Sequence, residues 1–389
     1  MKILFEDTIP FGYEYLSELA EVTRYAWQSL TPEDVADADI MAIRSTTKIN
    51  ATLLEKASSL SFVTTATSGT NHIDGSYLNQ RGIAFDDAGG CNAVAVAEYV
   101  LSTLFNAHNA QKLSLPNITV GIVGAGHVGS ALSARLVALG VDVKLCDPPL
   151  QADGDKREFC SFEEILTCDV ITLHVPYVPS GPHATANLIN ERVLASLKSS
   201  QLLINACRGE VIDEAALIAR LKQDNAPTVV LDVFNNEPSI NLDLLAHCWM
   251  VTPHIAGHSV EGKVRGTQII YEQIAARLGK PVSKSLNDFL DTLPEKNVTF
   301  SATSSQMLDI NDIGQLFLSV YNIADDDKKM REALAAAGAD VASTFASLRK
   351  KYRIRRECTA YTLKPASTLS SPSQQTLVQL GFGLVGHTV

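Results

Sequence analysis

Short apolar runs alternate with segments of helical periodicity over the first 285 residues of this chain. Four such runs, rich in aliphatic and β-branched side chains, lie at residues 1–7, 38–45, 60–69 and 82–89. Between them, EYLSELAEV (14–22) and NATLLEKASS (50–59) carry apolar residues at helical spacing. The alternation predicts parallel strands that are joined by helical crossovers.

A second series of strands is expected after a long helix at residues 92–113. Six apolar runs follow that helix: ITVGIVGAG, VDVKLCDP, DVITLHVP, QLLINACRG, TVVLDVF and WMVTPHIAG. Helical patterns separate these runs, and another long helix is expected at 259–280. After about residue 285 the sequence becomes polar and helical with a Ser/Thr/Pro-rich stretch, so we expect residues 290–389 to form a separate small α+β domain.

A chain of 389 residues is too long for one ordinary hydrophobic core, so two or three domains are expected. The N-terminal segment MKILFEDTIP is typical of a first strand, and no apolar run reaches the roughly 18 residues of a membrane span. The formal net charge of −11 argues against a nucleic-acid partner. The seven cysteines are scattered without a CxxC pair, which is typical of reduced thiols in the cytoplasm and supports no metal site.

The motif Gly124-x-Gly126-x-x-Gly129 lies between an apolar strand and a helical segment, as a dinucleotide fingerprint requires. In such a motif Gly124 permits the tight turn, Gly126 lets the pyrophosphate approach the backbone and Gly129 allows close helix–strand packing. Asp147 ends the next strand, where a carboxylate can accept hydrogen bonds from both ribose hydroxyls and would repel a 2′-phosphate. The motif therefore favours NAD over NADP, and a glycine-rich turn without a ligand is the alternative.

Three polar residues follow three successive strands of this second series. Arg208, Glu237 and His254 should therefore lie at the carboxyl edge of one parallel sheet, where ligands bind. Arg208 can hold a substrate carboxylate with its planar fork. His254 can take a hydroxyl proton as hydride leaves C2, because imidazole titrates near neutral pH, and Glu237 can fix its tautomer. The set predicts oxidation of a 2-hydroxy acid, although each residue could instead belong to an ordinary turn or strand end.

At this point the chain resembles the D-isomer-specific 2-hydroxyacid dehydrogenases over about residues 1–285. The matching segments are NAVAVAEY, GIVGAGHVG, LINACRGEVIDEAAL, VVLDVFNNEP and VTPHIAGHS. The resemblance implies the catalytic roles argued above for Arg208, Glu237 and His254. It also implies NAD contacts at Asp147, Ala206, Cys207, Arg208, Asp232 and Gly257.

The same resemblance implies a fold in which a Rossmann-type nucleotide-binding domain is inserted in a flavodoxin-like substrate domain. Residues 1–95 and 258–285 would form the substrate-binding domain, and residues 96–257 the NAD-binding domain. A C-terminal α+β domain at 290–389 would follow, and in similar members of the family such a domain serves dimerisation. A homodimer is therefore expected.

Along its whole length the chain is most similar to members of this family that act on a phosphorylated 2-hydroxy acid in pyridoxal phosphate synthesis. The similarity includes IRSTTKIN, TATSGTNHID, GGCNAVAVAEY and HIAGHSVEGKVRGT. It implies substrate contacts at Ser45 and Thr67, and residue chemistry adds Arg44 as a cation for the phosphate. His258 stands where we expect tyrosine in these members, and a histidine can still donate a hydrogen bond to phosphate.

Two other functions remain open from the sequence alone. The first is a related dehydrogenase that acts on 3-phosphoglycerate, glyoxylate or hydroxypyruvate. The second is an NAD-sensing scaffold, which would keep this fold and bind partner proteins instead of turning over a hydroxy acid. Turnover with hydroxy acids, measured beside partner capture that depends on NADH, separates these classes.

Overall fold

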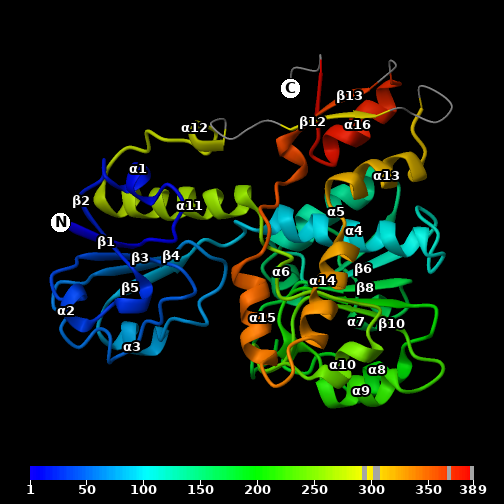
Figure 1. Ribbon diagram of the computed structural model, residues 1–389, viewed down its shortest axis with the longest axis horizontal. Coiled ribbons are helices and arrows are strands. Elements are labelled where there is room, and N and C mark those ends of the chain that lie inside the picture. Colours follow the sequence, from blue (N-terminus) through cyan, green and yellow to red (C-terminus); the bar gives the residue numbers. More distant parts are fainter. Residues whose placement is uncertain (291–295, 301–306, 366–368, 386–389) are drawn as a thin grey trace. The chain divides into compact units, whose positions relative to one another are not determined.

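The computed structural model describes residues 1–290, 296–300, 307–365 and 369–385 (Figure 1). The chain divides into two compact units. The first unit contains Met1–Asn92 and Ser259–Glu295, and the second contains Ala93–His258 and Lys296–Val389. Each unit is built on a parallel sheet with helices packed on it.

The sheet of the first unit has the strand order β2-β1-β3-β4-β5, which is the flavodoxin-like order. Its strands are β1 (Lys2–Glu6), β2 (Glu21–Tyr25), β3 (Ile40–Ile43), β4 (Phe62–Thr65) and β5 (Ala84–Asp87). Successive side chains of a strand point to opposite faces, so Ile3 and Phe5 pack with helix α11 (Val260–Leu278) while Leu4 belongs to the core on the other side. The shorter helices of this unit are α1 (Gly12–Leu16), α2 (Pro32–Val35), α3 (Gly75–Gln80) and α12 (Asn287–Leu290).

Two helical predictions in this unit are wrong. The helix expected at 14–22 ends at Leu16, and Glu21–Tyr25 form the edge strand β2. Most side chains of β2 are exposed and it pairs with β1 through the backbone, so its sequence carries no apolar alternation. The segment at 50–59 forms turns and not a regular helix. The Asn50 side chain accepts a hydrogen bond from the Leu53 amide at 3.0 Å, and the Asn50 carbonyl accepts one from the Leu54 amide at 3.2 Å, but this first turn does not continue as a helix.

The sheet of the second unit has the order β7-β6-β8-β9-β10-β11, with every neighbouring pair parallel. Its strands are β6 (Thr119–Val123), β7 (Asp142–Cys146), β8 (Val170–Leu173), β9 (Leu202–Asn205), β10 (Thr228–Leu231) and β11 (Met250–Val251). The chain runs from β6 to one side and then returns to the other side at β8, which makes a topological switch point at β6. The Rossmann-type α/β fold predicted from the sequence is therefore confirmed.

Helices cover both faces of this sheet (Figure 1). Helices α4 (Ala93–Asn109) and α5 (His127–Ala138) share one core with β6 and β9. Smaller helices belong to the opposite core or to the connections: α6 (Pro148–Ala152), α7 (Phe162–Ile165), α8 (Glu191–Ser196), α9 (Glu214–Leu221) and α10 (Leu242–His247). Single 3-10 turns lie at Trp27–Ser29, Gly209–Val211 and Cys358–Ala360.

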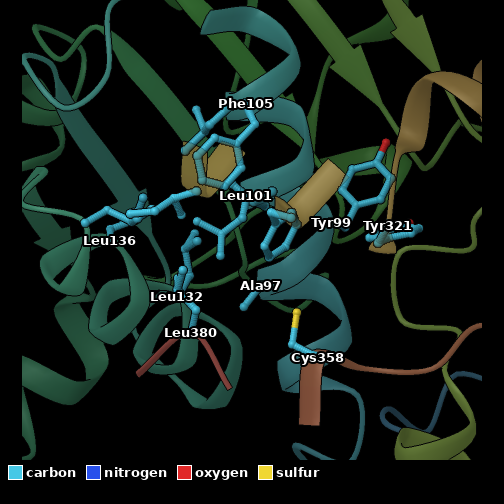
Figure 2. Packing of buried hydrophobic residues seen from close by; sticks show 14 of the residues in the cluster. Ala97, Tyr99, Leu101, Phe105, Leu132, Leu136, Tyr321, Cys358 and Leu380 are labelled. Carbon is cyan, nitrogen blue, oxygen red and sulfur yellow. The ribbon is translucent and has the colours of Figure 1, made fainter. Parts of the chain in front are cut away.

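The C-terminal residues group with this second unit, and the separate α+β domain expected from the sequence stays a prediction. They form the parallel strands β12 (Lys296–Phe300), β13 (Tyr361–Pro365) and β14 (Gly383–Leu384), and the helices α13 (Ile310–Val320), α14 (Ile323–Ala335), α15 (Val341–Lys350) and α16 (Ser371–Gln379). Figure 2 shows Tyr321, Cys358 and Leu380 gathered with residues of α4 and α5 in one core. The apolar faces of α13 and α16 lie in this core, whereas Met330, Leu334 and Phe345 of α14 and α15 lie in the core on the opposite face of the sheet. Part of the predicted domain (residues 291–295, 301–306, 366–368 and 386–389) lies outside the described residues.

Candidate active site

Glu237 and His254 are bonded to each other in the second unit. Glu237 lies in the loop after β10 and His254 in the loop after β11, and Nδ1 of His254 lies 2.7 Å from Oε2 of Glu237. The other carboxylate oxygen of Glu237 accepts a hydrogen bond from the Phe234 amide at 3.0 Å. Burial alone would raise the pKa of Glu237, but the hydrogen bond from His254 and the other donors lower it overall. The carboxylate is therefore held ionised beside the imidazole, as a partner that fixes its tautomer must be.

The backbone of His254 is fixed by Asp232, at the end of β10. His254 has a φ of 56°, a left-handed conformation that is uncommon for a side-chain-bearing residue. This conformation costs free energy, so it persists only where the surrounding structure imposes it. Its amide donates to the carbonyl of Asp232 at 2.7 Å. The Asp232 carboxylate accepts from the Thr252 hydroxyl and from the amides of Ile255 and Ala256, at 2.6, 2.8 and 2.9 Å. Asp232 is therefore the anchor of the loop that carries the histidine.

From the sequence alone Asp232 was expected only to contact NAD, and its structural role was not apparent. Burial is the main cause that raises the pKa of Asp232, and only 1% of the residue is exposed. The hydroxyl of Tyr99, on α4, lies 2.8 Å from that of Thr252 and extends the network. In the sequence, the position of Thr252 two residues before the candidate catalytic histidine could have indicated that it supports this loop.

Arg208 lies in the turn after β9, which Asn205 holds in place. The Asn205 side chain donates to the carbonyl of Arg208 at 2.9 Å and accepts from the amide of Cys207 at 3.1 Å. The Arg208 guanidinium donates to the carbonyl of Cys207 at 2.7 Å. A Cβ at Gly209 would lie 2.1 Å from the backbone carbon of Phe234, so only glycine lets this turn pack against the loop of Glu237. The half-buried guanidinium is thus oriented by its own strand end.

The glycine-rich turn opens α5 after β6. Gly124 has a φ of 92°, and a Cβ there would lie 2.5 Å from the carbonyl oxygen of His174. A Cβ at Gly129 would lie 2.2 Å from the oxygen of Gly124, so both positions require glycine. A Cβ at Gly126 would have no neighbour within 4 Å, and within this described helix no side chain caps the first turn. Open space over helical amides fits the pyrophosphate of a dinucleotide.

Asp147 lies beside this turn. Its carboxylate accepts from the amides of Ala125 and Leu150 at 2.8 and 3.1 Å. A carboxylate has about four lone-pair sites, so two backbone bonds leave capacity for ribose hydroxyls. Arg157, which sequence analysis missed, donates to the Ala125 carbonyl at 2.9 Å and to the Ser130 hydroxyl at 2.7 Å. The residues around the turn therefore fit NAD.

The remaining predicted NAD contacts lie on the loops that carry Arg208 and His254. Ala206 is half-buried after β9, and Gly257 is half-buried three residues after His254. Cys207 is buried, and burial raises the pKa of its thiol to about 11, so it is not a ready nucleophile. The NAD contacts of these three residues stay predictions.

The predicted phosphate contacts of the first unit follow β3 and β4. Glu6, at the end of β1, is fully buried and accepts hydrogen bonds from the Thr46 and Thr47 hydroxyls at 2.6 and 2.7 Å. It also accepts from the Arg44 amide at 3.0 Å and from the Thr8 hydroxyl. The loop that carries Arg44 and the exposed Ser45 is therefore built around one carboxylate that the sequence did not reveal.

We expect Glu6→Gln to destabilise the chain by about 1–3 kcal/mol at neutral pH, because an amide cannot accept from all these donors. Burial would raise the pKa of Glu6, but the donors lower it below the ordinary 4.5. The stabilising contribution of Glu6 is therefore present above about pH 4.5 and lost as the pH falls through the lower folded-state value.

Urea unfolding at several pH values measures this effect. The loss of stability below about pH 4.5 should be smaller in Glu6→Gln than in the wild type, and the exposed Glu55→Gln is the matched control. Equal stability of Glu6→Gln and Glu55→Gln at neutral pH would refute the assigned role.

Other side chains of the first unit add to this polar edge. The Thr67 hydroxyl lies 2.8 Å from that of Thr65, which in turn lies 3.1 Å from Nε2 of His72. Lys263, on the first turn of α11, is an exposed residue, yet desolvation of its ammonium group and the charge of Arg44 lower its pKa. The positive charge of Arg44 therefore disfavours the charged form of Lys263. From the sequence alone, no role was expected for Lys263.

In the described part of the chain, no three His, Cys, Asp or Glu side chains are grouped closely enough to hold a metal ion. The same described residues contain no helix with the length and apolarity of a membrane span.

Comparisons with known proteins identify the family. The NAD binding domain of D-isomer specific 2-hydroxyacid dehydrogenases matches residues 93–256, and a domain of unknown function (DUF3410) matches residues 292–381. Erythronate-4-phosphate dehydrogenase of Pseudoalteromonas atlantica is 42% identical over 382 residues, covering 98% of this chain and 99% of that protein. The enzyme of the same name from Marinobacter nauticus is 43% identical, covering 99% of this chain and all of that protein. This chain belongs to the erythronate-4-phosphate dehydrogenase family.

Membership of this family makes the chain an NAD-dependent 2-hydroxyacid dehydrogenase, which confirms the class and cofactor predicted from the motifs. Solved structures agree on the fold. The NAD+-bound 3-phosphoglycerate dehydrogenase of Entamoeba histolytica has a TM-score of 0.60 and 23% identity, covering 73% of this chain and 97% of that one. D-lactate dehydrogenase of Aquifex aeolicus has a TM-score of 0.56 and 23% identity, covering 71% and 95%.

Proposed function

We propose that this chain oxidises 4-phospho-D-erythronate to 2-oxo-3-hydroxy-4-phosphobutanoate, with NAD as acceptor, in pyridoxal 5′-phosphate biosynthesis. The observation that carries the chemistry is the 2.7 Å contact between His254 Nδ1 and Glu237 Oε2 beside a nucleotide-binding fold. Relatives named erythronate-4-phosphate dehydrogenase align with nearly the whole chain, which supports this choice of substrate.

His254, Glu237 and Arg208 have separate roles in this reaction. When bound, NAD supplies the acceptor for the hydride that leaves C2. Nδ1 of His254 is committed to Glu237, so Nε2 is the ring nitrogen that takes the hydroxyl proton. The ionised Glu237 stabilises the imidazolium that results. Arg208 binds the substrate carboxylate and orients C2, since a guanidinium fork matches a carboxylate in two parallel hydrogen bonds.

The 4-phosphate is proposed to bind Arg44, Ser45 and Thr67, with His258 as a further donor. The loop of Arg44 and Ser45 is fixed by Glu6, and the neighbouring Lys263 adds a second cation. A chain with a net charge of −11 needs such a local group of cations for a dianionic phosphate.

His258 gives this proposal a pH dependence. An imidazolium donates a stronger hydrogen bond to phosphate than a neutral imidazole does, so KM for the phosphorylated substrate should rise as the pH passes neutrality. The rise should be absent in His258→Ala and should be measured against a substrate without phosphate. A KM that stays flat with pH in both wild type and His258→Ala would remove His258 from the phosphate site.

We further propose a cytoplasmic homodimer, as expected from similar members of the family. Light scattering of the full chain should give about twice the 41.9 kDa monomer mass. A monomeric mass at the concentrations used for activity would contradict the dimer and leave the chemistry untouched.

The substrate is tested by steady-state turnover with 4-phosphoerythronate, 3-phosphoglycerate, glycerate and lactate. NAD and a 2-oxo acid acceptor are both present, so that slow cofactor release cannot hide turnover. A preference of a hundredfold or more for 4-phosphoerythronate, about 2.7 kcal/mol, supports the proposal. Greater activity on 3-phosphoglycerate, glyoxylate or hydroxypyruvate would leave the dehydrogenase class unchanged and assign a different substrate. A serine-binding titration would then test for a regulatory site. No turnover would favour the NAD-sensing scaffold.

A further inference from the structure

The guanidinium of Arg355 is buried in the second unit, and only 3% of the residue is exposed. It stacks over the ring of Tyr321, with 3.5 Å from the guanidinium carbon to the ring centroid. It donates to the carbonyl of Ala95 at 2.8 Å and to Oε2 of Glu98 at 3.1 Å, both on α4. Its third partner is the carbonyl of Ala256, at 3.0 Å.

Ala256 connects this arginine to the candidate catalytic loop. The Ala256 amide donates to Asp232 at 2.9 Å, while its carbonyl accepts from Arg355 at 3.0 Å. The loop is thus held on one side by the end of β10 and on the other by the C-terminal region. Because His254 lies two residues earlier and has a left-handed backbone, its position depends on the loop being held at both points.

Stability alone is a poor reason to bury this charge. Glu98 is fully buried too, and it also accepts from the Cys358 amide at 2.7 Å. Replacing a buried ion pair by apolar residues is often neutral or stabilising, because desolvation of two charges offsets their attraction. An apolar side chain could fill the space of Arg355, but it could not donate to two separate carbonyls.

We propose that Arg355 is a positioning residue for His254, which acts by fixing the carbonyl of Ala256. This inference rests on the proposed role of His254. It gives a part in catalysis to a residue of the region matched by a domain of unknown function. The C-terminal region would then contribute to the chemistry within its own chain.

Arg355→Lys tests the proposal, because lysine keeps the charge and loses the fork. We expect kcat to fall about tenfold or more, as for a lost hydrogen bond to a charged group, with NADH affinity nearly unchanged. The matched control is Arg353→Lys, in the same segment. Arg353 donates to Asp326 at 3.2 Å and has no described bond to the loop of His254, so kcat should stay within about twofold.

A double-mutant cycle separates positioning from a merely structural role. If Arg355 acts through His254, Arg355→Lys should change kcat less than about twofold in a His254→Gln background. A tenfold loss that persists undiminished in that background, or an unchanged kcat in folded Arg355→Lys, overturns the proposal.

Should Arg355→Lys fail to fold, Tyr321→Leu replaces it in the cycle. This variant keeps Arg355 and removes the ring on which it stacks, so a smaller loss with the same dependence on His254 is expected. An unchanged kcat in folded Tyr321→Leu overturns the proposal. A wild type that oxidises no 2-hydroxy acid would instead refute the proposed function.

Discussion

His254→Gln is expected to lower kcat by about 10²- to 10⁴-fold, the usual contribution of a positioned general base. Glutamine has nearly the same length and can bond Glu237, but it cannot take up the hydroxyl proton. Steady-state turnover of the folded variant with saturating NAD and substrate measures this effect.

The control for this variant is binding of NADH, which should stay close to that of the wild type. The glycine-rich turn and Asp147 lie on other strand ends and do not depend on the imidazole. A folded His254→Gln variant with wild-type kcat would show that another group takes the proton.

Arg208→Ala should lower kcat/KM by about 10- to 150-fold with every 2-hydroxy acid, since a hydrogen bond to a charged group contributes about 1.5–3 kcal/mol. Both terms should change: KM rises because the carboxylate loses its anchor, and kcat falls because C2 is no longer oriented. NADH binding should remain nearly intact. Substrate kinetics and NADH fluorescence titration give these quantities.

Arg208→Lys is the informative companion. Lysine retains the positive charge but cannot form two parallel hydrogen bonds, so it should restore KM more than kcat. An Arg208→Ala variant that loses NADH binding and keeps turnover would assign this residue to the cofactor instead of the substrate.

The pattern of apolar and polar residues alone was sufficient to predict most of the buried strands. β6, β9 and β10 are fully covered on both faces and therefore appear as unbroken apolar runs. The exposed edge strand β2 pairs through backbone groups, which leave no trace in side-chain polarity. The placement of α13 and α16 on α4 and α5 could not be foreseen either, because an amphipathic helix does not specify which apolar face it will cover.

Some residues of the candidate site could also be predicted from the sequence, and others could not. Arg208, Glu237 and His254 were recognisable because each follows a predicted strand, and strand ends meet at one edge of a parallel sheet. Glu6, Asp232 and Arg355 hold such loops in place through hydrogen bonds. Their partners are mostly backbone amides, hydroxyls and carbonyls. Every sequence contains such groups everywhere, so these contacts become visible only in the folded structure.

The most direct test of the account follows deuterium from C2 of 4-phosphoerythronate in a single turnover of the NAD-loaded wild type. Hydride transfer predicts one deuterium in the nicotinamide ring of the reduced cofactor, and a slower turnover than with the protonated substrate. Deuterium that appears in solvent water, or stays on the phosphorylated product without reduced cofactor, would contradict oxidation at C2 by this chain.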